Sequence, residues 1–305
     1  MSRIHDILTK AERDGTVRRT HAAVASEPAP AGAPEVMPGV PPASPPPAPA
    51  RSERFPDGAR VPAARSAVAE TAAPPRRLVE AGHLSPLLVA ALEPHAVVAE
   101  QYRQLRTRIM LSEDGQPRRV LLVTSPAKGD GKSVTAANLA LTMAQEFNRR
   151  IVLVDGDLRE PGVHLLLGLP PTPGLADVLL GNVSLEDAIV HLPDFNMSVL
   201  PAGLAPDRPA ELLGSVAMRR SLDALRARFD RVVVDMPPVV PLADVGVLAP
   251  QVDGVLLVVR AGETKKPDIE RALSVFDANR LVGLVLNDAG QPQAGYTAYA
   301  APARS

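Results

Sequence analysis

Short apolar runs rich in valine, leucine and isoleucine recur from about residue 119 onward, and amphipathic stretches separate several of them. Runs this short, bounded by turn-forming residues, indicate strands that are buried on both faces. The predicted strands are Arg119–Thr124, Ile151–Val154, Ser198–Leu200, Arg231–Val234, Gly254–Val259 and Val282–Leu286. Helical periodicity predicts helices at His95–Leu111, Lys132–Phe147, Val216–Phe229 and Pro267–Asn279. This alternation favours an α/β fold with a mostly parallel central sheet and helices on both faces.

The same pattern divides the chain into segments. Apolar residues at helical spacing predict a short amphipathic helix within residues 1–20. Residues 21–92 are rich in proline and alanine, and because such a segment cannot bury enough apolar surface to fold, we predict a disordered linker. The folded domain is expected to span residues 93–290, followed by a flexible tail at residues 291–305.

Composition removes several classes of function. A formal net charge of -1 over 305 residues gives no indication of a nucleic-acid partner, and none is expected. The chain has no cysteine, which excludes a disulfide framework, a thiol nucleophile and cysteine-ligated metal sites. No apolar run approaches the roughly 20 residues that span a bilayer, and the first residues lack the apolar segment of a secretory signal. We therefore expect a cytoplasmic protein.

The strongest chemical signal is a glycine-rich loop between a predicted strand and a predicted helix. Its sequence, Ser-Pro-Ala-Lys-Gly-Asp-Gly-Lys-Ser, occupies Ser125–Ser133. Glycines let backbone N–H groups converge on phosphate oxygens, and the helix N-terminus adds partial positive charge. Lys132 can reach the β- and γ-phosphates of ATP, and the Ser133 hydroxyl can ligate Mg²⁺. The predicted nucleotide-binding residues are Lys128, Gly129, Asp130, Gly131, Lys132, Ser133 and Val134.

The loop departs from the usual P-loop pattern at two positions. Pro126 stands where the pattern has glycine, and Lys128 precedes Lys132 by four residues. The result resembles the deviant Walker A loop of the ParA/MinD group of ATPases, a resemblance that implies action of Lys128 across a dimer interface. A fortuitous Gly/Lys loop is the alternative, but the strand before it and the helix after it favour phosphate binding.

Two further predicted strands end in aspartate. Asp155 and Asp157 stand in an Asp-x-Asp-x-Arg turn, and Asp235 ends the run Val232-Val-Val. Carboxylates at the C-terminal ends of parallel strands point into the crevice where ligands bind, so Mg²⁺ would compensate their charge beside phosphates. Each aspartate alone is readily explained as a helix N-cap or turn former. Two such strand ends together with the phosphate loop favour a nucleotide site.

Further motifs between about residues 95 and 290 share the pattern of one family. They are the Walker A loop Ser125–Ser133, the Walker A′ turn Asp155–His164, the segments Gly174–Gly181, Leu200–Gly203 and Pro209–Ser215, and the Walker B strand that ends at Asp235. In this combination the chain resembles the bacterial tyrosine kinases (BY-kinases) of polysaccharide synthesis and export, of the CpsD/CapB type. The resemblance implies a tyrosine kinase domain of P-loop NTPase fold, within the ParA/MinD-like group, over residues 93–290.

The resemblance also implies a role for each polar residue of the nucleotide site. Lys132 and Ser133 bind the phosphates and Mg²⁺, and Asp157 and Asp235 hold the metal, partly through water. Asp155 orients or deprotonates the attacking tyrosine hydroxyl, which is mostly protonated at neutral pH. The expected catalytic residues are therefore Lys132, Asp155, Asp157 and Asp235, and the expected metal ligands are Ser133, Asp157 and Asp235.

Two regions outside the motifs carry further expectations. Asn287, at the end of the last predicted strand, is expected to face the adenine, although a strand-end cap accounts for it equally well. Glu100-x-x-Arg103-x-x-Arg106 matches the family's oligomerisation motif, and we favour an interface over a solvated helix face.

The C-terminal tail holds the expected autophosphorylation sites, Tyr296 and Tyr299. BY-kinases usually end in a tyrosine-rich cluster that neighbouring subunits phosphorylate. This chain has only 3 tyrosines in all, so the cluster is sparse, and incidental tail tyrosines remain the alternative.

The leading hypothesis is a Mg-ATP-dependent protein-tyrosine autokinase that regulates exopolysaccharide or capsule biosynthesis and export. By resemblance its partners are further copies of itself, a cognate tyrosine phosphatase, and a membrane adaptor or chain-length regulator. The adaptor is expected to recruit the kinase to the inner face of the cell membrane. A ParA/MinD-like nucleotide-switched ATPase is the alternative, and Pro209–Ser215 and the Glu100 motif favour the kinase over it. A scaffold that binds nucleotide without chemistry is a third hypothesis, against which the intact Lys132 and aspartates argue.

Overall fold

The computed structural model describes residues 77–78, 83–113, 117–146 and 149–290. The predicted helix within residues 1–20, the tail at residues 291–305 and most of the predicted linker lie outside the described residues. The folded part begins before the expected boundary at residue 93, because Leu88 is fully buried and helix α2 (Val89–Leu92) follows it directly.

Among the described residues, eight strands form one sheet in the order β1-β4-β5-β3-β6-β2-β7-β8. Neighbouring strands run parallel except β4 and β5, which are antiparallel. The strands are β1 (Arg77–Leu78), β2 (Val120–Thr124), β3 (Ile151–Asp155), β4 (Val190–Leu192), β5 (Met197–Leu200), β6 (Arg231–Asp235), β7 (Gly254–Arg260) and β8 (Leu281–Asn287). All six predicted strands form, and the predicted α/β fold class is confirmed.

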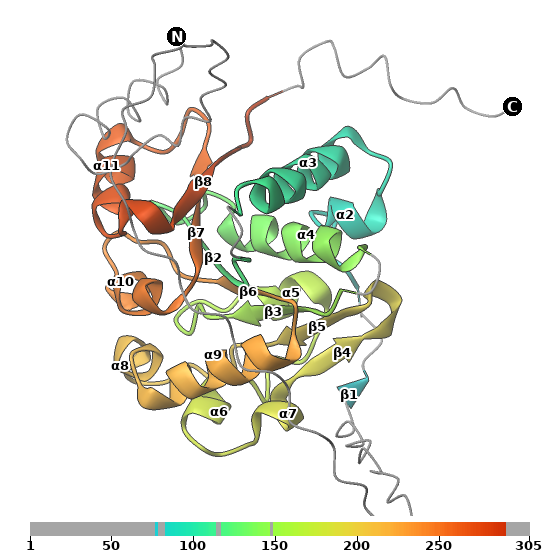
Figure 1. Cartoon of the computed structure of the whole chain (residues 1–305), viewed down its shortest axis with the longest axis vertical. Helices are drawn as coiled ribbons and strands as arrows, with labels where there is room; N and C mark the ends of the chain where they lie inside the picture. Colours follow the sequence, from blue (N-terminus) through green and yellow to red (C-terminus); the bar gives the residue numbers. More distant parts are fainter. Residues whose placement is uncertain (1–76, 79–82, 114–116, 147–148, 291–305) are drawn as a thin grey trace, which may run out of the picture. The chain divides into compact units, whose positions relative to one another are not determined.

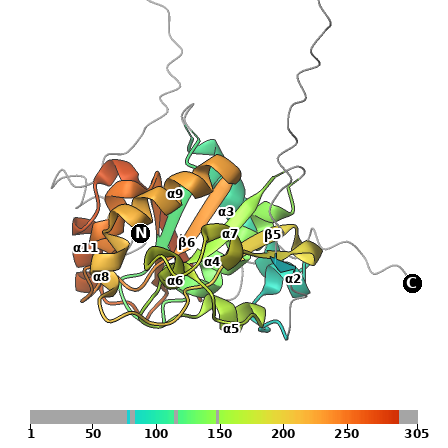
Figure 2. The same ribbon diagram turned by 90° about the horizontal axis from the view of Figure 1, so that it is seen from below.

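Helices cover both faces of the sheet (Figures 1 and 2). One face carries α2, α3 (Val97–Leu111), α4 (Lys132–Ala144) and α5 (Val163–Leu167). The other carries α6 (Leu175–Leu179), α7 (Leu185–Ala188), α8 (Pro209–Leu213), α9 (Val216–Arg228), α10 (Asp244–Leu248) and α11 (Lys266–Ser274). Within the described residues, no helix combines the length and apolar character needed to cross a membrane.

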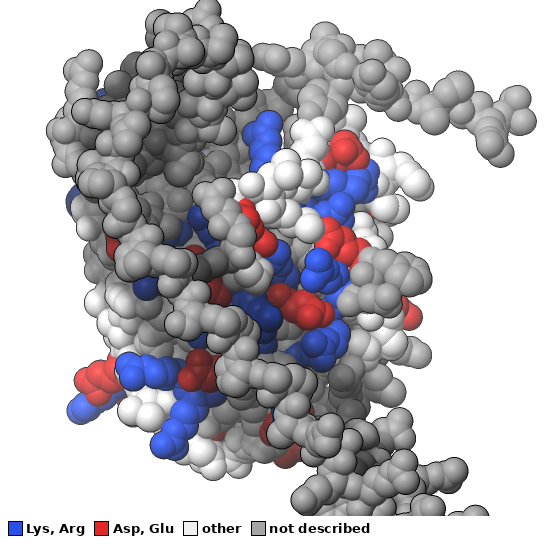
Figure 3. Space-filling model, viewed as in Figure 1, with Lys and Arg blue, Asp and Glu red and all other residues white. Residues whose placement is uncertain are grey.

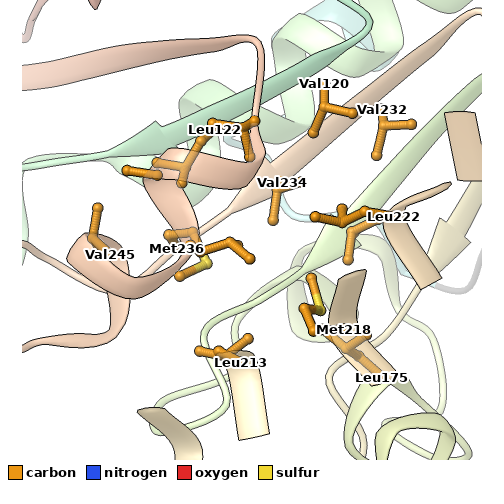
Figure 4. Packing of buried hydrophobic residues seen from close by; sticks show 14 of the residues in the cluster. Val120, Leu122, Leu175, Leu213, Met218, Leu222, Val232, Val234, Met236 and Val245 are labelled. Atoms are coloured by element: carbon orange, nitrogen blue, oxygen red, sulfur yellow. The ribbon is translucent and has the colours of Figure 1, made fainter. Parts of the chain in front are cut away.

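Successive residues of the central strands enter opposite hydrophobic layers. In β2, Val120 and Leu122 join the cluster that contains Leu222 of α9, and all three are seen in Figure 4. Leu121 and Val123 join the second cluster, on the α4 side. Because every residue of β2 is buried, its sequence is a continuous apolar run rather than an alternation of polar and apolar residues.

The strand order brings the three predicted motifs to one edge of the sheet. β6 lies between β3 and β2, so that Asp155 pairs in register with Asp235, and Asp235 with Val123. The phosphate loop follows β2 directly. The Walker A loop, the Walker A′ turn and the end of the Walker B strand therefore meet at the carboxyl ends of parallel strands, where such sheets bind ligands.

Candidate active site

The phosphate loop depends on two glycines with left-handed backbone conformations. Gly129 and Gly131 have φ angles of 89° and 94°, which side chains with a Cβ rarely adopt. A Cβ at Gly131 would also lie 2.1 Å from the side-chain amide nitrogen of Asn287, so any larger residue would have to displace that side chain. The loop ends at this residue, and α4 begins at Lys132.

Asp130 holds the loop in place through three separate contacts. Its carboxylate accepts hydrogen bonds from the Ala127 N–H at 2.9 Å and from the Thr264 hydroxyl at 2.8 Å. Its backbone carbonyl accepts from Asn287 Nδ2 at 3.0 Å. Asp130 is almost fully buried, so its side chain braces the loop. Asn287 caps this loop, as a strand-end residue can, and its expected contact with adenine remains a prediction.

Lys132 points into the space between the two acidic strand ends. Its Nζ donates to Asp157 Oδ2 at 2.8 Å and to Ser133 Oγ at 3.1 Å, and lies 3.8 Å from Asp235 Oδ1. Burial favours the neutral amine, but the carboxylates of Asp235 and Asp157 outweigh it and raise the pKa of Lys132. The lysine is therefore charged and paired with the groups predicted to hold a metal.

Asp235 is fully buried, and neither carboxylate oxygen has a hydrogen-bond partner. Burial raises the pKa of Asp235 to about 6, against the opposing charge of Lys132. A buried, ionised carboxylate is stabilised by a nearby cation, because buried charges are costly unless they are paired. Ser133 and Asp157 lie beside the same lysine. No group of three or more His, Cys, Asp or Glu in the described residues could hold a metal by itself. The residues therefore fit Mg²⁺, which beside nucleotides usually takes further ligands from phosphate and water.

Asp155 organises the Walker A′ turn. Its carboxylate accepts hydrogen bonds from the N–H groups of Asp157, Gly162 and Val163 at 3.2, 3.1 and 3.0 Å. Burial and the nearby Asp235 carboxylate raise the pKa of Asp155 to about 8. In this conformation the Asp155 carboxylate holds the Walker A′ turn in place, and its burial favours the protonated form.

Comparison with known proteins identifies the family. No family model matches the chain. The tyrosine-protein kinase YwqD of Bacillus subtilis is 36% identical over 202 residues, which cover 66% of this chain and 85% of that protein. The putative tyrosine-protein kinase CapB of Staphylococcus aureus is 32% identical over 67% of this chain and 90% of its own length. The chain belongs to the bacterial tyrosine kinase family.

The fold agrees with this assignment. The kinase domain of the Escherichia coli tyrosine kinase ETK superimposes with a TM-score of 0.65, at 26% identity, over 71% of this chain and 84% of that domain. The expected enzyme class, a protein-tyrosine kinase, is therefore confirmed.

The described side chains of the predicted oligomerisation motif contact their own chain. Arg103 donates to Glu100 at 2.6 Å and to the Pro94 carbonyl at 2.8 Å. Arg106 donates to the Thr142 carbonyl at 2.8 Å and lies 3.1 Å from Glu146. The contacts of Arg106 tie α3 to α4, whereas those of Arg103 stay within α3 and the segment just before it. Opposite charges are also interspersed on the surface that Figure 3 shows. The interface role of the motif stays a prediction.

Three polar residues near the site have roles that the sequence did not suggest. Glu160 pairs with Lys128 at 2.6 Å, with both side chains exposed. Thr264, after β7, reaches across to Asp130. Asp244, at the start of α10, binds Arg159 of the Walker A′ turn. Nothing in the local pattern marks Thr264 or Asp244, since each contact joins segments far apart in sequence.

A groove of about 590 Å³ runs beside the loop, between α3 and the end of β8. Its apolar lining includes Val98, Leu105, Leu284 and Leu286, and Asn287 also lines it. Because Asn287 also contacts the phosphate loop, this groove adjoins the predicted phosphate site.

Proposed function

We propose that this kinase is a Mg-ATP-dependent tyrosine autokinase that regulates exopolysaccharide or capsule assembly. The observation that supports it most is the position of Lys132, directly after the phosphate loop, between Asp157 and the buried Asp235, whose carboxylate accepts no hydrogen bond from the described residues. A P-loop lysine, a buried carboxylate that accepts no hydrogen bond and relatives that are tyrosine kinases point to the same chemistry.

The nucleotide would lie along the phosphate loop. Backbone N–H groups of residues 128–134 would bind the phosphates, and Lys132 would leave Asp157 to contact them. Ser133, Asp157 and Asp235 would hold Mg²⁺, which when bound neutralises charge on the transferring phosphoryl group. The adenine ring would extend toward Asn287 and the groove between α3 and β8.

Asp155 would orient the attacking tyrosine hydroxyl and receive its proton. Burial raises the pKa of Asp155, so that its ionised form is a stronger base than an ordinary aspartate. Among the described residues, its Oδ1 accepts only one hydrogen bond, from the Asp157 N–H, and so has a lone pair left for the hydroxyl. The acceptor tyrosines would be Tyr296 and Tyr299, which lie outside the described residues.

The kinase would cycle between assembled and dispersed states. Further copies of this chain would associate through Glu100, Arg103 and Arg106, and a membrane adaptor would recruit them to the inner face of the membrane. Phosphorylation of the tail adds negative charge and would withdraw it from a neighbouring active site. A cognate tyrosine phosphatase would reset the system. Light scattering tests this switch, since phosphorylation that leaves the oligomer mass unchanged would contradict it.

The catalytic proposal is tested by measuring two products in one tube. The protein is incubated with Mg-ATP, released phosphate is quantified, and protein phosphotyrosine is detected on a blot. The expected result is phosphotyrosine in the wild type and none in Lys132→Met. Phosphate release without phosphotyrosine would instead support the nucleotide-switched ATPase. If both signals are absent even with the cytoplasmic segment of a membrane adaptor added, the proposal is wrong.

A further inference from the structure

Arg159 and Asp244 form a two-bond ion pair between the Walker A′ turn and the segment that follows Walker B. Arg159 Nε donates to Asp244 Oδ2 at 2.7 Å, and Nη2 donates to Oδ1 at 3.2 Å. Asp244 is fully buried, whereas the Arg159 side chain is 38% exposed. A guanidinium that meets a carboxylate with two bonds fixes direction as well as distance.

A backbone hydrogen bond also joins the Walker A′ turn to the end of the Walker B strand. At the start of the turn, the Gly156 N–H donates to the Asp235 carbonyl at 2.8 Å. The contact is close, because a Cβ at Gly156 would lie 2.7 Å from the sulfur of Met236. Asp157 therefore lies between two contacts. Gly156 contacts the end of the Walker B strand at Asp235, and Arg159 contacts Asp244 in the segment that follows that strand.

The orientation of Asp157 depends on the shape of this turn. Its Oδ1 accepts a hydrogen bond from the Glu160 N–H at 3.0 Å, while Oδ2 faces Lys132. If the turn moves at Arg159, the Glu160 N–H moves with it and the carboxylate loses its fixed direction. Groups that orient a metal ligand in this way commonly matter for metal affinity nearly as much as the ligand does.

We propose that Arg159 is a positioning residue that, through Asp244, holds Asp157 at the separation from Asp235 that a shared Mg²⁺ requires. This inference rests on the proposed function, since it assumes that Mg²⁺ binds between these carboxylates. In this proposal Arg159 acts through its contact with Asp244 and not by binding the metal or the nucleotide. Its removal should therefore weaken the contribution of Mg²⁺ while nucleotide binding in the absence of metal is kept.

The test compares binding of mant-ADP, a fluorescent ADP analogue, in EDTA and in Mg²⁺. The variants are Arg159→Met and the isosteric Asp244→Asn, with Arg159→Lys as a conservative replacement. The matched control is Arg150→Met, because Arg150 pairs with Asp230 at 3.4 Å and joins the opposite ends of β3 and β6. Melting temperatures are measured for each protein to establish that it is folded.

The expected result is that Mg²⁺ tightens binding in the wild type and in Arg150→Met. Arg159→Met and Asp244→Asn should lose about tenfold or more of that gain, with unchanged affinity in EDTA. Arg159→Lys should recover part of it, since an ammonium can still bind Asp244 with one bond. A wild-type Mg²⁺ gain in both variants, or an equal loss with and without Mg²⁺, would overturn the inference. A wild type without any Mg²⁺ gain would instead refute the proposed function, and the inference with it.

Discussion

Lys132 Nζ lies 2.8 Å from Asp157 Oδ2, so the lysine predicted to bind phosphate is paired with a carboxylate predicted to hold the metal. We expect nucleotide binding to break this pair. Asp157→Asn should therefore free the lysine, so that mant-ADP binds in EDTA at least as tightly as to the wild type. The same variant should lose the gain from Mg²⁺ and lower phosphotransfer by about 100-fold or more, as expected when a metal ion that stabilises developing charge is no longer held. A wild-type Mg²⁺ gain in Asp157→Asn would exclude Asp157 as a metal ligand.

The ionised Asp235 carboxylate should destabilise the fold of the metal-free protein. Burial raises its pKa to about 6, above the value of about 4 expected in the unfolded chain, so the folded protein binds this proton more tightly. The ionised carboxylate therefore destabilises the fold, and the penalty grows as pH rises from about 4 to about 6 and persists above it. In EDTA at pH 8, Asp235→Asn should raise the melting temperature by roughly 5 °C, with little change at pH 4.

Thermal unfolding at both pH values checks this prediction. The same variant must lose Mg²⁺-dependent nucleotide binding, because an amide is a poor metal ligand in this position. If Asp235→Asn melts no higher than the wild type at pH 8, the carboxylate is not a net cost to the fold.

Gly131 should tolerate alanine much less well than Gly262. Both have positive φ angles, 94° and 77°, so alanine adds backbone strain of about 1–2 kcal/mol at each. Only at Gly131 would the new methyl group overlap Asn287, whose displacement leaves the Asp130 carbonyl without its partner. Denaturant unfolding and mant-ADP titration should show lower stability and weaker binding for Gly131→Ala than for Gly262→Ala. Equal behaviour of the two variants would contradict the close contact.

Asn138 should be required to hold the N-terminal part of the domain against α4. Its side chain accepts from the Ala90 N–H at 2.9 Å and donates to the carbonyls of Leu87 and Val134 at 2.9 Å. Asn138→Ala leaves buried groups without partners and should destabilise the protein by about 2 kcal/mol. Thr107→Ala, which removes an exposed hydrogen bond in α3, is the control and should change stability little. Amide exchange at Ala90 should accelerate in Asn138→Ala alone, and unchanged protection there would show that other contacts hold the segment.

The sequence predicted the central strands well because each is buried on both faces and its apolar run ends where the strand ends. β2, β3 and β6 also place the Walker motifs, so the strand pattern was enough to predict that Lys132 and the three aspartates lie at one edge of the sheet. β4 was missed because Val190–Leu192 is a three-residue strand that pairs antiparallel with β5. Its apolar character depends on a neighbour, and a run of that length carries little signal.

The contacts that brace the site could not be predicted in the same way. Thr264 reaches Asp130 and Asp244 reaches Arg159 only because the sheet brings distant loops together. Asn138 gave no signal either, since a polar residue in a helix is usually exposed and this one is fully buried. Local patterns located the groups expected to carry the chemistry, whereas tertiary structure was needed to find the groups that hold them in place.

The most direct test of the account is mass spectrometry of the protein after incubation with Mg-ATP. Intact masses and peptide maps are compared for the wild type, Lys132→Met and the Tyr296→Phe/Tyr299→Phe double variant. The account predicts added phosphate on Tyr296 or Tyr299 in the wild type, with none there in either variant. Phosphate release that continues while no tyrosine is modified, or modification that persists in Lys132→Met, would contradict it.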